Sequence, residues 1–275
     1  MAERFVIREM TAIAGGVVRC VVDAPRVATH AAPGQFVIVR VAEGGERIPL
    51  TISDHDPTAG TITLVVQVVG ATTSAIAALG VGAHLADVLG PLGRPTEIDR
   101  FGLCVVVAGG VGAAIALPVA RALASVGNDV VAVIGARTAD LLVLVDEFER
   151  VCETVVVTDD GTAGRPGLVT DALVDQLAQR RPDRVFAVGP IPMMAAVAEV
   201  TRPAAIPTIA SLNPIMVDGT GMCGGCRVRV GDETRFACVD GPEFDAHAVD
   251  FDLLAARNTA YRAAETCQAA GVGGA

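Results

Sequence analysis

The chain has 275 residues, enough to bury more than one hydrophobic core without disulfide or metal staples. Its 31 acidic residues outnumber its 21 basic ones, and the net charge of −10 excludes a nucleic-acid backbone as partner, because phosphate binding needs a basic surface. Every basic residue is an arginine, so lysine Schiff-base chemistry and a P-loop lysine are also excluded.

The cysteine count and the N-terminal residues bear on the cellular compartment. Seven cysteines are an odd number, and the first ten residues, MAERFVIREM, carry charges throughout instead of an apolar signal core. We therefore expect a reducing, cytoplasmic environment. The segment 101–120 is uncharged over about the length of a membrane span, but its glycines and Pro118 favour a buried strand, a tight turn and a buried helix. No membrane span is predicted.

The first hundred residues have the texture of β-strands. Apolar or alternating runs of strand length are separated by turn-rich breaks and predict an antiparallel barrel. They are FVIRE (5–9), VVRCVVDA (17–24), QFVIVRVA (35–42) and TITLVVQVV (61–69).

From residue 101 the pattern changes to alternating strands and helices. Such alternation favours a doubly wound parallel sheet with helices on both faces. The strand-like runs include LCVVVAG (103–109), DVVAVIGAR (129–137), TVVVTDD (154–160) and RVFAVGP (184–190), and the first helical run is AAIALPVARALASVG (113–127).

The sequence thus predicts a β plus α/β protein of four parts. The first is an N-terminal antiparallel Greek-key β-barrel, residues 1–99. A nucleotide-binding α/β domain follows at 100–211. A small glycine-rich module that holds three of the cysteines, here called the cluster module, occupies 212–250. A C-terminal helix and tail occupy 251–275.

The stretch VDGTGMCGGC (217–226) carries the most specific spacing. Asp218 is followed by Cys223 after four residues, by Cys226 after two more and by Cys238 beyond a short insert. Plant-type iron–sulfur proteins use the order C-x4-C-x2-C with a distant fourth cysteine, so Asp218 occupies the place of the first thiolate. A [2Fe–2S] cluster fits best. A zinc site with three thiolates and a carboxylate, or a turn with incidental thiols, is the alternative.

A second motif, AGGVGAA (108–114), lies between a predicted strand and a predicted helix. Glycines at such a turn let the backbone approach a pyrophosphate, whose charge is met by the helix N-terminus. Two later loops follow strand-like runs and therefore face the same crevice. The candidate residues for a dinucleotide are Gly109, Gly110 and Gly112, and the two later loops add Asp159, Asp160, Gly189 and Pro190.

Two segments of the barrel region are candidates for a flavin. In RIPLTIS (47–53) an arginine can bind a diphosphate and a hydroxyl can bond the edge of a flavin ring. A predicted helix opens after residue 70 and offers backbone amides and hydroxyls to an anion. The candidate FAD residues are Arg47, Pro49, Leu50, Thr51, Ile52, Ser53, Gly70, Thr73 and Ser74.

With these pieces in this order, the chain resembles the ferredoxin-reductase-type flavoproteins that carry a barrel, a nucleotide domain and a C-terminal iron–sulfur module. PGQF (33–36), RIPLTIS, GPLGRP (90–95), AGGVG, GPIPMM and the cysteine group resemble the branch that contains the electron-transfer subunit of dihydroorotate dehydrogenase. Asp218, within VDGTGMCGGCRV, is closer to the small subunit of NADH-dependent ferredoxin:NADP oxidoreductase, also described as sulfide dehydrogenase. Where many ferredoxin reductases carry Arg-x-Tyr-Ser, this chain has Arg47 followed by Ile48, Pro49, Leu50 and Thr51.

The resemblance implies FAD, a [2Fe–2S] cluster held by Asp218, Cys223, Cys226 and Cys238, and NAD(H). It also places Asp159, Asp160, Gly189 and Pro190 near the nicotinamide. It also implies a larger flavoprotein and iron–sulfur partner, similar to a glutamate synthase small subunit, in an electron-bifurcating complex. No catalytic acid–base residue is expected, because hydride transfer between nicotinamide and flavin needs none. Two alternatives stay open: the electron-transfer subunit of a dihydroorotate dehydrogenase, and a zinc-stabilised, non-catalytic interaction subunit.

Overall fold

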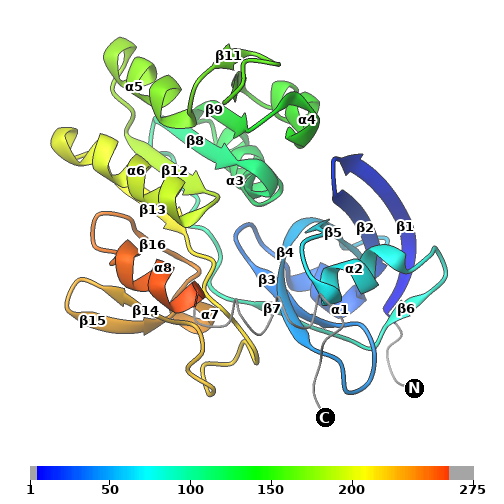
Figure 1. The fold of residues 1–275 in the computed structure, drawn as a ribbon. Helices are drawn as coiled ribbons and strands as arrows, with labels where there is room; N and C mark the ends of the chain where they lie inside the picture. The colour runs from blue at the N-terminus through cyan, green and yellow to red at the C-terminus, as the bar shows by residue number, and fades with distance from the viewer. Residues whose placement is uncertain (1–4, 260–275) are drawn as a thin grey trace.

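The structure is a computed structural model that describes residues 5–259, and it consists of a barrel, an α/β domain and a small third module (Figure 1). Seven antiparallel strands and two short helices form the barrel. They are β1 (Phe5–Ala14), β2 (Val17–Asp23), α1 (Pro25–His30), β3 (Phe36–Arg40), β4 (Arg47–Asp56), β5 (Thr61–Gln67), α2 (Ala71–Ala78), β6 (His84–Leu85) and β7 (Asp87–Leu92).

The strand order explains why this sheet is nearly closed. It runs β6-β1-β2-β5-β4-β3-β7, so the two outermost strands are neighbours in sequence and only Ala86 separates them. The amide of Ala86 donates to the carbonyl of Arg40 on β3, which carries the chain from one edge of the sheet to the other. The inward residues alternate along the strands, and Ile7, Ile62 and Leu64 are almost completely buried. The expected antiparallel barrel is confirmed.

The α/β domain has a parallel sheet of order β11-β10-β9-β8-β12-β13, extended at one edge by an antiparallel strand from the third module. Its elements are β8 (Leu103–Gly109), η1 (Gly110–Gly112), α3 (Ala113–Ser125), β9 (Asp129–Ala136), η2 (Ala139–Leu141), α4 (Val145–Glu149), β10 (Glu153–Thr158), β11 (Arg165–Pro166), α5 (Val169–Gln179), β12 (Arg184–Val188), α6 (Ile191–Thr201), η3 (Arg202–Ala204) and β13 (Thr208–Ser211).

Helices cover both faces of this sheet. One core cluster contains the α3 and α4 side chains, and another contains those of α5 and α6. The central strand β8 is buried over most of its length, which is why its sequence is continuously apolar instead of alternating. The uncharged segment 101–120 is a strand, a turn and a helix, as expected. Within residues 5–259, no helix combines the length and the apolar character needed to cross a bilayer.

The cluster module is attached to the α/β sheet. It contains β14 (Arg227–Val230), β15 (Glu233–Phe236), α7 (Ala237–Asp240) and β16 (Glu243–Asp245), and α8 (Phe251–Thr259) follows it. Strand β16 pairs antiparallel with β13, so the sheet extends past residue 211, where the sequence placed the end of the α/β domain. The part of the predicted C-terminal helix and tail beyond Thr259 lies outside the described residues.

All three parts meet at the side chain of Glu243. The Thr96 hydroxyl, on the link between barrel and α/β domain, donates to Glu243 Oε1 at 2.8 Å. Gly34 of the barrel has a φ of +82°, and a Cβ there would lie 2.3 Å from Thr96 Oγ1. Burial raises the pKa of Glu243 to about 7. The other charged residues around the same hollow are Arg94, Glu97, Arg184, Asp240 and Asp245.

The raised pKa predicts a loss of stability as pH increases. Between the ordinary glutamate pKa of 4.5 and about 7, only the folded chain keeps the Glu243 proton, so stability decreases across that window and stays lower above it. Glu243→Gln cannot ionise at this position. Relative to wild type, its free energy of unfolding should therefore increase by about 2 kcal/mol from pH 5 to pH 8, after allowance for partial exposure. Denaturation at both pH values, with exposed Glu9→Gln as control, measures this gain. Equal effects at both pH values would contradict it.

Candidate functional site

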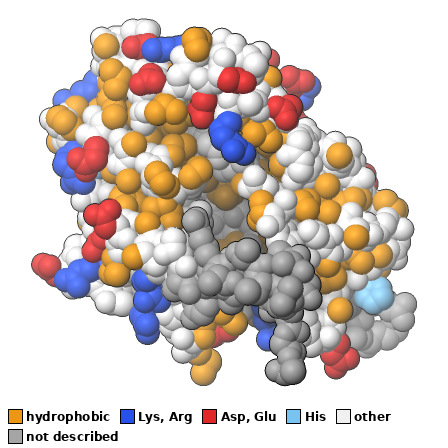
Figure 2. All heavy atoms as spheres, in the orientation of Figure 1, with side chains coloured by type: hydrophobic (Ala, Val, Ile, Leu, Met, Phe, Trp, Pro, Cys, Tyr) orange, Lys and Arg blue, Asp and Glu red, His pale blue; other side chains and the backbone are white. Residues whose placement is uncertain are grey.

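A cavity of about 770 Å³ lies at the carboxyl ends of the parallel strands. It lies where the strand order reverses, because the chain proceeds from β8 to β9 and β10 on one side and then to β12 and β13 on the other. Apolar side chains border the hollow between the two larger domains (Figure 2). Predicted residues Gly109, Gly110, Gly112, Asp159, Gly189 and Pro190 line the cavity.

Close backbone packing explains two of the glycines at the cavity floor. A Cβ on Gly112 would lie 2.4 Å from the carbonyl oxygen of Val188, so any larger residue would push α3 away from β12. A Cβ on Gly109 would lie 2.5 Å from the sulfur of Met193. The α3 amides and the β12 end are thereby kept within reach of one bound molecule, as a dinucleotide site requires.

The two predicted aspartates have different environments. Asp159 follows β10 and lines the cavity, whereas Asp160 is absent from its lining. The hydroxyl and the amide of Thr162 donate to Asp160 Oδ1 at 2.7 and 3.0 Å, and together they lower the pKa of Asp160. Asp160 therefore stabilises the turn. Strand β10 lies two strands from β8 on the side opposite β12, so Asp159 and the Gly189–Pro190 pair are at opposite ends of the cavity.

Arg137 follows β9 and also lines the cavity. Other cavity residues were not found from the sequence: Thr170 lies on α5, and Ser211 and Asn213 lie at the end near the cluster module. The barrel contributes Val17 and Gln67. No local motif marks these residues, because only tertiary packing brings their separate segments to one cavity.

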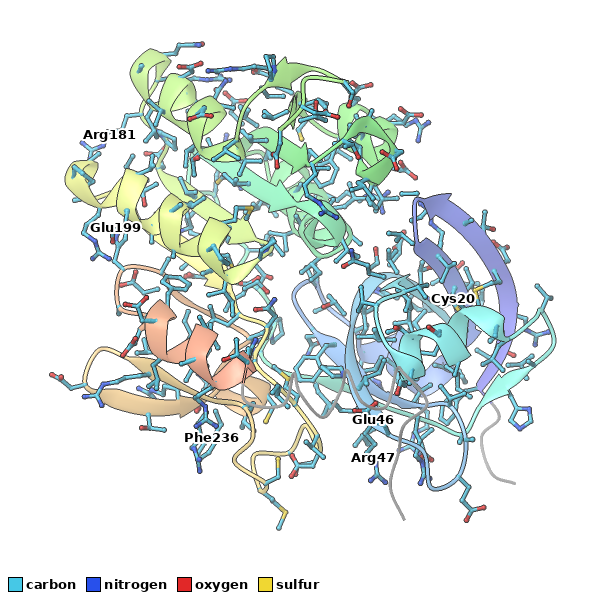
Figure 3. All side chains as sticks on the ribbon, in the orientation of Figure 1. Cys20, Glu46, Arg47, Arg181, Glu199 and Phe236 are labelled. Atoms are coloured by element: carbon cyan, nitrogen blue, oxygen red, sulfur yellow. The ribbon has the colours of Figure 1, made fainter. Side chains whose placement is uncertain are left out.

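The flavin candidates gather at one end of the barrel. Strand β4 carries Arg47 through Ser53, and Thr51 pairs with Phe36 in the neighbouring strand β3. The Thr72 hydroxyl donates to Glu46 at 2.5 Å, which brings the start of β4 to the N-terminus of α2. Figure 3 shows Glu46 and Arg47 side by side there.

The hydroxyls of α2 are only partly available to a ligand. The amides of Val69 and Gly70 donate to Thr73 Oγ1, both at 3.0 Å, so this hydroxyl caps the helix. Ser74 is exposed, and Gly70 is the N-cap residue in an extended conformation. Arg47 is also exposed, so the arginine and the first turn of α2 form an open cationic and amide-rich end.

A β-hairpin brings two of the predicted cysteine ligands together. Arg227 at the start of β14 pairs with Phe236 at the end of β15, and the amide of Ala237 donates to the Cys226 carbonyl at 3.1 Å. The sulfurs of Cys226 and Cys238 are consequently 3.1 Å apart and buried. Burial and the neighbouring Cys226 raise the pKa of Cys238 to about 12, so a bound cation would be needed to hold Cys238 as a thiolate.

The other two predicted ligands lie in the loop before the hairpin. The amides of Thr220 and Cys223 each donate to the Asp218 carboxylate at 2.8 Å, and they hold its pKa below the ordinary value. The Gly225 amide donates to Cys223 Sγ at 3.4 Å. Gly219, with φ +73°, packs so closely on the barrel that a Cβ would lie 2.6 Å from Leu92. The loop is therefore anchored on the barrel.

The four residues form two pairs instead of one converged group. Cys226 and Cys238 are adjacent through their sulfurs, and Asp218 is bonded to the backbone of Cys223. In the part of the chain that the structure describes, no three acidic, histidine or cysteine side chains form a preformed metal site. The two pairs together offer three sulfurs and one ionised carboxylate, a donor set that fits a two-iron centre. Backbone amides point at two of the sulfurs, as is usual around such a centre.

Two family models match the chain. The iron–sulfur cluster binding domain of dihydroorotate dehydrogenase B matches residues 213–250, and the oxidoreductase NAD-binding domain matches residues 106–199. The first covers the module that holds all four predicted ligands, and the second covers the glycine loop and both later loops of the cavity. An iron–sulfur module is thus favoured over the zinc alternative.

Curated relatives extend over most of the chain. The chain is 48% identical over 244 residues to the dihydroorotate dehydrogenase B electron transfer subunit homolog of Thermotoga maritima. This match covers 89% of this chain and 86% of that protein. The chain is 34% identical over 256 residues to the dihydroorotate dehydrogenase B electron transfer subunit of Geobacillus thermodenitrificans, covering 90% of this chain and 98% of the relative.

Among solved structures, a chain of the NADH-dependent reduced ferredoxin-NADP oxidoreductase, studied for flavin-based electron bifurcation, has a TM-score of 0.92 and 46% identity. The match covers 97% of this chain and 96% of that one. The ferredoxin reductase of carbazole 1,9a-dioxygenase, with 20% identity and a TM-score of 0.60, shares the barrel and nucleotide-domain fold alone.

Proposed function

We propose that this chain, which belongs to the family of dihydroorotate dehydrogenase B electron transfer subunits and their homologues, is the NAD(H)-linked subunit of an electron-bifurcating ferredoxin:NADP oxidoreductase. The family gives the general activity: the protein is an oxidoreductase subunit that transfers electrons and has an NAD-binding domain and an iron–sulfur domain. Its cofactors are FAD, an iron–sulfur cluster and NAD(H), and its family implies a larger catalytic partner.

The observation that carries the proposal is the near-complete match to the ferredoxin-NADP oxidoreductase chain, at 46% identity and a TM-score of 0.92. The aspartate at the first ligand position supports the same branch. A dihydroorotate dehydrogenase subunit is the second candidate, and the 48% identity to the Thermotoga maritima homolog favours it.

The chain's own residues have separate tasks in this proposal. Arg47, Pro49, Leu50, Thr51, Ile52 and Ser53 on β4, with Gly70, Thr73 and Ser74 at α2, bind FAD. Gly109, Gly110 and Gly112 bind the dinucleotide diphosphate, and Gly189 and Pro190 position the nicotinamide. Asp160 supports the turn that holds Asp159. When bound, the flavin accepts a hydride and releases its electrons singly.

We assign the cluster to Asp218, Cys223, Cys226 and Cys238. The buried Cys226–Cys238 pair excludes water from one side, whereas Cys223 is exposed on the other. Asp218 replaces a sulfur with a harder oxygen donor, which changes the electronic properties of the centre.

An apolar patch around the exposed cysteine supports docking of the larger subunit. Met222 is 89% exposed, and Val217 and Val239 are about half exposed. All three border the cluster loop, and Val239 packs on Gly221 of that loop. Exposed apolar residues grouped in this way are typical of an interface. We infer that a flavoprotein similar to the glutamate synthase small subunit covers them.

Anaerobic purification with the native partner tests the proposal. We expect FAD and two irons per small subunit, and ferredoxin reduction that requires NADPH and NAD⁺ together. Co-purification with a barrel-type dehydrogenase, with dihydroorotate as the electron donor, would establish the second candidate instead. Zinc without flavin would contradict both.

Asp218→Ala should remove the cluster, because it deletes a ligand and the acceptor of two loop amides. Asp218→Cys should restore a cluster with altered visible and EPR spectra, because a thiolate again occupies the position. Iron, sulfide and FAD are measured on the same samples, with exposed Asp232→Ala as control. An unchanged spectrum in Asp218→Ala would falsify the ligand assignment.

Asp159 should favour NAD(H) over NADP(H). A carboxylate in this part of the cavity can bond a ribose hydroxyl but repels a 2′-phosphate. Asp159→Ser should raise kcat/KM for NADPH by roughly tenfold, assisted by the nearby Arg137. Asp160→Asn, whose oxygen still reaches Thr162, is the matched control. Steady-state flavin reduction with both nucleotides measures the ratio, and an unchanged ratio would exclude Asp159 as a selector.

A further inference from the structure

Helix α8 ends in two residues that reach two different loops. The guanidinium of Arg257 donates through Nη2 to the carbonyl of Gly225 at 3.2 Å. The side-chain amide of Asn258 donates to the carbonyl of Asn213 at 2.9 Å. Asn213 lines the dinucleotide cavity, and Gly225 belongs to the cluster loop. The last turn of α8 therefore bonds to both ends of segment 213–225, which leads from the dinucleotide cavity to the cluster loop.

The Gly225 peptide is central to the ligand loop. It lies between Cys223 and Cys226, and its amide donates to Cys223 Sγ at 3.4 Å. The Arg257 charge therefore acts on the peptide group between Gly225 and Cys226, which directly follows the peptide group whose amide bonds a ligand sulfur. Arg257 is half-buried, so water screens its charge less than that of an exposed arginine.

We propose that Arg257 is a positioning residue whose positive charge, fixed on the Gly225 carbonyl, makes the cluster easier to reduce. The proposal rests on the assignment of a [2Fe–2S] cluster to this loop. Reduction of a bound cluster by one electron would make the centre one charge unit more negative. A fixed cation beside the ligand loop stabilises that form over the oxidised one. Arg257 thereby favours electron transfer from flavin to cluster.

The other charged residues near the loop differ from Arg257 in sign, in pairing or in exposure. Asp218 is negative and opposes reduction. Asp240 accepts the Phe236 amide at 2.9 Å and pairs with Arg94, so these two charges offset each other. The Arg227 guanidinium packs near Gly224 on the exposed side of the hairpin. Arg257 differs from these residues because it lies on α8, outside the loop, and bonds to the loop through the Gly225 carbonyl.

The test is an EPR-monitored redox titration of the complete protein with bound FAD. Arg257→Gln removes the charge and keeps a hydrogen-bond donor, Arg257→Lys keeps the charge, and Arg257→Glu reverses it. We expect Gln to shift the one-electron reduction equilibrium of the cluster about tenfold toward the oxidised form, or 59 mV, with a larger shift for Glu. Lys should stay near wild type.

Arg181→Gln is the matched control. Arg181 also donates to a backbone carbonyl, that of Ala204, at 2.9 Å, but it lies at the far side of the α/β domain (Figure 3). Its removal should leave the cluster equilibrium unchanged. The flavin potential, measured on the same samples, serves as an internal reference.

Each outcome bears on a different statement. A wild-type protein without a [2Fe–2S] signal overturns the cluster assignment itself. A normal cluster whose potential is the same in the Gln and Glu variants overturns the role of Arg257. Equal shifts in Lys and Gln also overturn it, because the charge would then not be the cause. If Gln does not accumulate as folded protein, Glu against Lys decides the same point.

Discussion

The short ladder between β13 and β16 is the interaction on which the arrangement of the molecule depends. It pairs Ser211, at the end of the nucleotide sheet, with Glu243, just beyond the cluster ligands. Backbone hydrogen bonds define the register of two strands, so the cluster module cannot slide along the α/β domain. Electrons pass singly between separated cofactors, and such a step requires that their separation be fixed.

The barrel is held to this unit by contacts of a different kind. Gly219 of the cluster loop packs against Leu92, and Thr96 bonds to Glu243. Two ion pairs at the surface, the partly buried Arg19–Glu147 pair and the exposed Arg121–Asp54 pair, join the barrel to the α/β domain. Exposed ion pairs contribute little, so close glycine packing and the buried carboxyl contribute more of the rigidity.

Part of the candidate site follows directly from sequence patterns. The glycine loop after β8 and the ligand spacing from Asp218 to Cys238 are local, because the geometry of a tight turn or a metal loop restricts neighbouring residues. Thr73 and Asp160 were also identified by pattern, and in the structure their oxygens accept hydrogen bonds that form a helix cap and a turn. A sequence pattern cannot distinguish a polar group that bonds a ligand from one that bonds its own backbone.

The sequence by itself determined the order of the three modules, the two sheet types and the four proposed ligand positions, because periodicity and spacing are local properties of the chain. Only the tertiary structure decided that β16 completes the nucleotide sheet, that Gln67 and Asn213 reach one cavity, and that Arg257 bonds the cluster loop. Those contacts join residues far apart in sequence, and their geometry is determined by packing between modules.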